Sequence, residues 1–164
     1  MNLFQYKDYL FLISSSFMST VKQILSQKEH LIVSVESSDA VLSALQKMKD
    51  NRIRSILVID DGKLQGIVSQ GDCAIKVLLN GLSPKTTKIS EIMTNHPFVV
   101  AEDFTADQCM SIMNAKRIRH LPVLKGQKVL GIISVGDLVK EIMKNQDSQI
   151  SFLENYIKGH GVNY

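Results

Sequence analysis

The sequence contains few of the residues that form disulfides, bind metals or stack on nucleic-acid bases. Its 164 residues include two cysteines, four histidines and no tryptophan, and only 6% are aromatic. Cys73 and Cys109 form no CxxC pair, and no two histidines have the spacing of a zinc site. We therefore expect neither a disulfide framework nor a structural metal, and the free thiols fit a reducing compartment such as the cytoplasm.

Strong net charge and long hydrophobic runs are also missing. A net charge of +3 is compatible with anionic ligands but does not by itself indicate nucleic-acid binding. The apolar run Tyr9–Ile13 is far shorter than the roughly 20 residues that cross a bilayer, and no cleavage-site pattern follows it. We expect no membrane span and no signal peptide, and we interpret residues 1–18 as an N-terminal extension.

What the sequence does contain is an internal repeat. The segment RIRSILVIDDGKLQGIVSQGD, residues 52–72, returns as RIRHLPVLKGQKVLGIISVGD, residues 117–137. Arg52 and Arg117, and likewise Gly66 and Gly131, are 65 positions apart. A repeat at this fixed offset predicts two copies of one structural unit.

Each copy has the pattern of a β-α-β-β-α unit. In the first we expect strands at residues 31–35, 55–60 and 64–68, a helix with apolar residues on one face at 41–48, and a second helix at 72–79. Gly62 suits the tight turn between the last two strands. A three-stranded sheet with helices on one face leaves its other face uncovered, and pairing two units would bury that face.

The second copy repeats these elements, and the chain continues beyond it. Residues 80–90 have a linker composition, and a short helix at Ile89–Met93 leads into the second unit. We place the units at residues 19–82 and 83–144, followed by a C-terminal helix and tail at 145–164. The stripe of Ile150, Leu153 and Ile157 on this helix indicates a partner surface, and we expect a homodimer.

The words GIVSQGD and GIISVGD place a serine and an aspartate at the start of a helix in each copy. Ser69 with Asp72, and Ser134 with Asp137, have nearly the spacing of a capping box, which is one interpretation. The alternative is that the carboxylate accepts hydrogen bonds from the two hydroxyls of a ribose. Gly66 and Gly131 leave room for an approach to the strand end.

The words RIRS and RIRH place arginines directly before a strand in each copy. Arginine presents a rigid fork of donors that suits a phosphate, and Arg117 and Arg119 with His120 are candidates for that contact. The other interpretation is a solvated rim of charges that closes the preceding helix.

These repeated words carry a resemblance to a known family. From Val21 to about Lys144 the chain resembles a tandem pair of cystathionine-β-synthase (CBS) domains, a so-called Bateman module. The resemblance rests on RIRHLPV and on the two Gly-h-h-Ser-x-Gly-Asp words, where h is hydrophobic, doubled at 65 positions. It implies a mixed α/β (α+β) fold of two β-α-β-β-α repeats related by pseudo-two-fold symmetry, with an added C-terminal helix.

The resemblance also implies a ligand and the residues that bind it. Such modules bind adenosine nucleotides between the repeats; AMP is the expected ligand, with ATP, ADP, NAD(H) and S-adenosylmethionine as alternatives. The residues at matching positions in the second repeat are Ser134, Asp137, Arg119, His120, Thr94, Pro97 and Phe98. Those in the first repeat are Ser69, Asp72, Arg54, Ser55, Ile32 and Val33. The first repeat departs from the pattern, since Leu57 replaces Pro122 and Ser55 replaces His120.

Three classes of function fit this chain to different degrees. We expect a non-catalytic nucleotide sensor that changes the activity of a regulated protein partner, which the sequence does not identify. An enzyme would need a nucleophile–base pair, a metal cluster or a phosphate-binding glycine loop, and the sequence shows none. A nucleic-acid binder is disfavoured because aromatic stacking platforms are lacking and each arginine pair comes with an aspartate.

Overall fold

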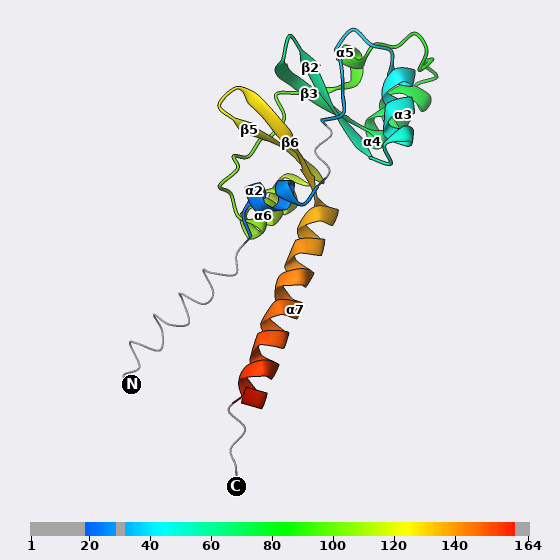
Figure 1. Ribbon diagram of the computed structural model, residues 1–164. Helices are drawn as coiled ribbons and strands as arrows, with labels where there is room; N and C mark the ends of the chain where they lie inside the picture. The colour runs from blue at the N-terminus through cyan, green and yellow to red at the C-terminus, as the bar shows by residue number, and fades with distance from the viewer. Residues whose placement is uncertain (1–18, 29–31, 160–164) are drawn as a thin grey trace.

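The computed structural model describes residues 19–28 and 32–159, which form two units side by side with one long helix leaving them (Figure 1). The first unit contains β1 (Ser34–Val35), β2 (Ser55–Asp60) and β3 (Lys63–Ser69). β1 runs parallel to β2, and β3 returns antiparallel to it. Its helices are α3 (Val41–Asp50), α4 (Gln70–Asp72), the π-helix η1 (Cys73–Leu78) and α5 (Ile89–Ile92).

Local sequence explains these elements. The alternation of buried side chains in β3 and the spacing of Val41, Ala44 and Met48 on α3 give each element one apolar face, and these faces meet in the core. Asp61 and Gly62 both have positive φ, +48° and +75°, as a two-residue hairpin turn requires. The turn predicted at Gly62 is therefore confirmed.

The second unit repeats this arrangement, except that its first strand is shortened to a single bridge. It contains α6 (Ala106–Lys116), β5 (His120–Lys125), β6 (Lys128–Ser134) and α7 (Val135–Gly159). β5 and β6 form an antiparallel hairpin with the register of β2 and β3. The expected first strand is here a single parallel bridge between Val100 and Val123.

The helix α2 (Val21–Ser26) precedes the first unit in the sequence but packs in the core of the second. Val21, Ile24 and Leu25 are buried there with side chains of α6, β5 and β6. The amide of Val21 donates to the carbonyl of Phe104 at 2.8 Å. The start of the described chain therefore completes the core of the unit that the chain builds last.

The expectation of three strands in each unit is wrong in detail, because the chain adds a strand as it crosses between units. β4 (Thr94–Asn95) pairs antiparallel with β3 beside Gly66 and Ile67, which makes the first sheet four-stranded. Gly66 permits this approach: a Cβ there would lie 2.7 Å from the carbonyl oxygen of Thr94. In the second unit, Leu25 fills the space beside Gly131. The protein's own chain occupies the room that both glycines leave.

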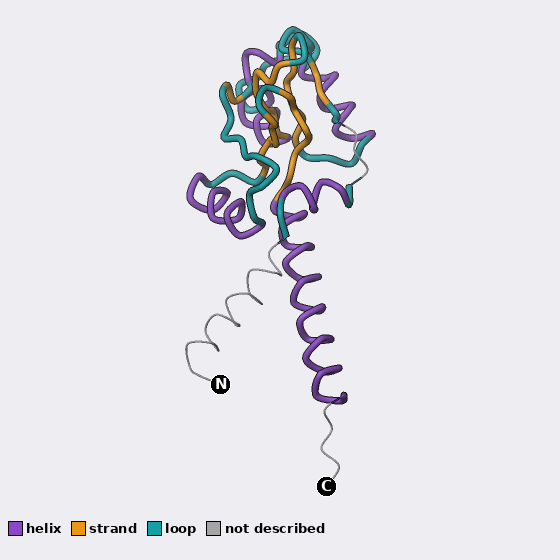
Figure 2. Tube along the Cα trace, turned by 60° about the vertical axis from the view of Figure 1, so that its left-hand side comes forward, coloured by secondary structure: helices purple, strands orange, loops and turns teal. Residues whose placement is uncertain are grey.

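Two helices also differ from the sequence expectation. The helix predicted at 72–79 is an α-turn followed by η1, in which the amide of Leu79 donates to the carbonyl of Ala74. The last helix of the second unit and the C-terminal helix are one continuous helix, α7, which extends well beyond both units (Figures 1 and 2). Within residues 19–28 and 32–159, no helix combines the length and the apolarity needed to cross a membrane.

The close contact at Gly66 leads to a test of the β3–β4 pairing. Gly66→Ala should destabilise the protein by about 1–3 kcal/mol, because the new methyl group meets a backbone carbonyl that cannot rotate away. Gly71→Ala is the matched control, since its nearest neighbour would lie at an ordinary contact distance of 3.5 Å. Urea denaturation measures both; equal midpoints for the two variants would contradict this account.

Candidate functional site

The Ser-x-x-Asp words form the helix caps that their spacing predicts. The hydroxyl of Ser69 donates to Oδ2 of Asp72 at 2.6 Å, and the amide of Ser69 donates to the same oxygen at 2.9 Å. Ser134 and Asp137 repeat both contacts at 2.7 Å. The capping interpretation is therefore confirmed, and the caps hold each carboxylate at the junction of a strand and a helix.

A lysine pairs with each carboxylate, but the two lysines come from different parts of the chain. Lys76, one turn further along the same helical segment, lies 2.8 Å from Oδ1 of Asp72. Lys28, which follows α2, lies 2.8 Å from Oδ2 of Asp137 and also donates to the carbonyl of Ile132 at 3.0 Å. No pattern in the sequence indicated Lys28, because its position depends on how α2 packs in the second unit.

Both aspartates are ionised at neutral pH. Partial burial acts to raise the pKa of Asp72 and of Asp137, but the hydrogen bonds from the lysine and the serine outweigh burial. The pKa of each carboxyl therefore lies below its usual value. Each group remains an acceptor with a full negative charge.

The first cleft, about 790 Å³ in volume, lies between the two units. Ser69 and Asp72 of the first unit form one side of it. The segment 94–98, which begins with β4, and the residues before β5 also line it. Its lining thus brings together Arg54, Ser55, Ser69, Asp72, Thr94, Pro97, Phe98, Arg117, Arg119 and His120, among others.

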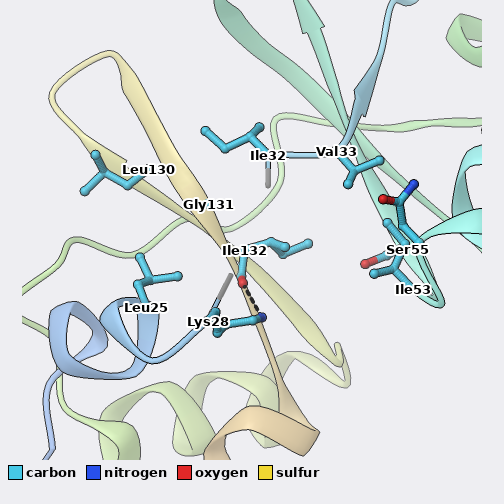
Figure 3. Close-up of a pocket in the computed structure, with 10 residues that line it drawn as sticks. Leu25, Lys28, Ile32, Val33, Ile53, Ser55, Leu130, Gly131 and Ile132 are labelled. Atoms are coloured by element: carbon cyan, nitrogen blue, oxygen red, sulfur yellow. Dashed lines mark hydrogen bonds between the residues drawn. The ribbon is translucent and has the colours of Figure 1, made fainter. Parts of the chain in front are cut away.

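The second cleft is related to the first by the pseudo-two-fold arrangement of the units. It consists of two adjoining pockets of about 390 and 480 Å³, which share Lys28, Ile53, Ser55 and Ile132. Ile32 and Val33 line the first of these pockets, opposite the strand β6 (Figure 3). Ser134, Asp137, Arg52 and Arg54 line the second, again with Arg119 and His120.

The structure groups the candidate residues differently from the two repeats of the sequence. Thr94, Pro97 and Phe98 lie in the cleft of Asp72, whereas Ile32 and Val33 lie in the cleft with Ser134 and Asp137. Each cleft therefore combines the carboxylate of one unit with the first-strand segment of the other, because the units face each other. His120 lines both clefts, so its replacement by Ser55 in the first repeat does not distinguish them.

Arginines that are strained or exposed provide the positive charge of both clefts. Arg52 and Arg117 have a left-handed backbone with φ of +54°, at a helix end where glycine is usual. The sequence predicted a phosphate contact for Arg117 but only a charged rim for Arg52; the occurrence of arginine at the same position in both repeats is a signal that could have identified Arg52 as well. His96, at φ +49°, is a third such residue and lines the first cleft.

These arginines have no acidic partners among the residues that the structure describes. The ion pairs there use Lys28, Lys76 and Lys125, so the guanidinium groups of Arg52, Arg54, Arg117 and Arg119 are uncompensated. The aspartate that accompanies each arginine pair in the sequence is matched by a lysine instead. Each cleft therefore combines arginines that have no acidic partner among the described residues with one acceptor carboxylate, an arrangement that favours anions.

His120 lies half-buried between the clefts, opposite Ser134 on the paired strand. Burial lowers the pKa of His120, and the nearby charges of Arg119 and Lys28 act in the same direction; only Asp137 opposes them. The imidazole is therefore neutral at neutral pH.

Both cysteines are buried in the cores of the units and line neither cleft. Burial raises the pKa of Cys73, and that of Cys109 to about 11, so both thiols are protonated and weakly nucleophilic. In the described part of the chain, no group of three or more His, Cys, Asp or Glu side chains could hold a metal ion.

Comparison with known proteins gives one consistent result. The profile of the CBS domain matches residues 21–78 and 89–144. The mitochondrial CBS domain-containing protein CBSX3 of Arabidopsis thaliana is 30% identical over 128 residues, which are 75% of this chain and 62% of that protein. The chain thus spans less than two thirds of the length of this plant relative.

Solved structures of CBS proteins share the fold. A CBS-domain protein from Burkholderia ambifaria is 41% identical with a TM-score of 0.75, covering 78% of this chain and 96% of the other. The CBS domain pair of protein MJ0100 was solved in complex with 5′-methylthioadenosine and S-adenosyl-L-methionine. It is 26% identical with a TM-score of 0.68, covering 77% of this chain and 98% of the other.

The lowered pKa of His120 predicts how stability depends on pH. As pH falls through the ordinary histidine value near 6.5, the unfolded chain binds a proton that the folded protein does not, so the free energy of unfolding should decrease. His120→Ser, which copies Ser55 of the first repeat, should flatten this decrease between about pH 7 and 5. Thermal unfolding across that range tests it. An unchanged slope in His120→Ser would refute the assignment.

Proposed function

Because this chain belongs to the CBS-domain family and carries two such domains in tandem, we propose that it is a regulatory module that binds an adenosine nucleotide. The ligand sites are the two clefts between the units. The module catalyses no reaction itself and acts by changing the activity of a partner protein.

One observation carries this proposal: each cleft combines an ionised, capped carboxylate with uncompensated arginines. A carboxylate such as Asp137 can accept hydrogen bonds from the two adjacent hydroxyls of a ribose. The guanidinium groups of Arg54 and Arg119 offer paired donors to a phosphate. A nucleotide presents these two groups together, at opposite ends of a sugar.

The apolar linings account for the base. Ile32 and Val33 in the second cleft, and Pro97 and Phe98 in the first, offer backbone and apolar surface against which an adenine can lie. The ligands named for MJ0100 both contain adenosine, which supports this class. We propose AMP in preference to S-adenosylmethionine here, because the cationic clefts favour a phosphate over a sulfonium ion.

We also propose a homodimer in which helices of both units contribute to the interface. Ile75, Leu78 and Leu79 on or directly after η1 are exposed by 62%, 62% and 79%. On α7, Val139, Met143 and Ile150 are exposed by 43%, 59% and 56%. Leu153 and Ile157, which complete the stripe seen in the sequence, lie outside the residues whose side chains the structure describes. A second copy, joined by a closed two-fold axis, would cover these surfaces.

The ribose assignment is tested by removing the carboxylate. Asp137→Ala should weaken AMP binding in the second cleft by roughly 10- to 150-fold, the equivalent of about 1.5–3 kcal/mol for hydrogen bonds to a charged group. Isothermal titration calorimetry measures this loss, with Asp147→Ala at an exposed position of α7 as the control. Wild-type affinity in a folded Asp137→Ala protein would leave Asp137 as a helix cap only. A thermal-shift series with AMP, ADP, ATP, NAD(H) and S-adenosylmethionine identifies the preferred ligand.

The dimer is tested by shortening α7. A chain that ends after Lys144 should dimerise more weakly, because it loses the C-terminal part of α7 and with it the exposed apolar residue Ile150. Sedimentation velocity at tens of micromolar measures the change. A monomeric full-length chain would overturn the proposal, and unchanged dimerisation after truncation would place the interface on the two units alone.

A further inference from the structure

Arg54 and Arg119 lie between the two clefts and line both of them. They occupy the same position in the repeat, directly before β2 and β5. Residues near a pseudo-two-fold axis border both of the sites that the axis relates. We call these two residues the central arginines.

The backbones of the central arginines are fixed in place by the helices that carry the acceptor carboxylates. The carbonyl of Arg54 accepts from the amide of Gln70 at 3.0 Å, and that of Arg119 accepts from Val135 at 3.0 Å. Gln70 and Val135 are the first residues of α4 and α7, directly after the capping serines. Each central arginine is therefore held close to its own carboxylate and also reaches the opposite cleft.

Because of this placement, the same positively charged side chains line both clefts. Asp72 borders only the first cleft and Asp137 only the second, but Arg54, Arg119, Ser55 and His120 border both. Two ligands would thus have separate ribose acceptors and a common set of phosphate donors. Their anionic ends would converge on one region, where each reduces the positive potential available to the other.

We propose that the two clefts are one coupled site in which bound phosphates compete for the central arginines. Occupancy of one cleft by a phosphorylated nucleotide lowers the affinity of the other cleft for a second. An uncharged nucleoside, which lacks the phosphate, fills both clefts independently. This inference rests on the proposed nucleotide binding and specifies how the site is regulated.

The coupling is reciprocal and depends on salt. By linkage, occupancy of the first cleft lowers the affinity of the second by the same factor as occupancy of the second lowers the affinity of the first. For two phosphate dianions facing shared charges, we expect a factor of roughly 5- to 20-fold, within the usual range of coupling between sites. Because screening shortens the reach of exposed charges, this factor should decrease as ionic strength increases.

The experiment must separate coupling from two clefts that merely differ in affinity. Asp137→Ala isolates the first cleft and Asp72→Ala isolates the second, so calorimetry on each variant gives the affinity of one cleft alone. The wild-type titration is then compared with the sum of the two single-cleft curves. AMP and adenosine, which differ only in the phosphate, are each titrated at 50 and 300 mM salt. Circular dichroism checks that each variant is folded.

With AMP, the second binding step of the wild type should be about 5- to 20-fold weaker than the sum of the single-cleft curves predicts. This difference should be smaller at high salt. With adenosine, the sum should reproduce the wild type. Additive curves for AMP, or the same deviation for adenosine, would overturn the coupling while leaving nucleotide binding intact.

Should one variant fail to fold, the AMP and adenosine titrations of the wild type still decide. If the wild type binds two adenosine molecules, and its two AMP affinities differ no more than its two adenosine affinities, the result counts against coupling. Absence of binding by both ligands would overturn the proposed function itself.

Discussion

Two short hydrogen bonds, from Ser69 to Asp72 and from Ser134 to Asp137, are the contacts on which the rest of the site depends. The same side chains begin a helix at the end of a strand, because the serine amide donates to the aspartate and the aspartate amide donates to the serine hydroxyl. The same contact fixes a carboxylate at the edge of a cleft and keeps it charged. Capping and the proposed ribose contact would use the same pair of side chains, so neither interpretation of the repeated words excludes the other.

The sequence was a good guide to features that depend on neighbouring residues. The strands 55–60 and 120–125 agree with β2 and β5, and the hairpin turn at Gly62 follows from local turn chemistry. The repeat offset correctly indicated two units, because both copies carry the same local pattern. Candidate residues at the same position in both repeats accordingly lie at the ends of strands, beside the clefts.

Features that depend on how the units face each other could not be predicted. The pairing of β4 with β3, the packing of α2 and the position of Lys28 all join residues far apart in the sequence. For the same reason the crossed composition of the clefts was missed: a sequence read one repeat at a time assigns Phe98 to the repeat of Asp137, whereas the structure places it opposite Asp72. Local patterns carry no information about such relations.

The placement of α2 has a consequence for the order in which the protein is built. Among the described residues, the core of the first unit is built from the stretch Val33 to Met93, so it can form once that stretch has left the ribosome. The second core needs Val21, which is made before the first unit, together with Leu138, which is made after it; nearby, Ser19 bonds to Glu141 across 122 positions. During synthesis α2 must therefore wait, its apolar face unpartnered, until the rest of its core arrives. Closing so long a loop is slow, and the second unit is the part of the nascent chain that remains longest exposed to misassembly with other copies.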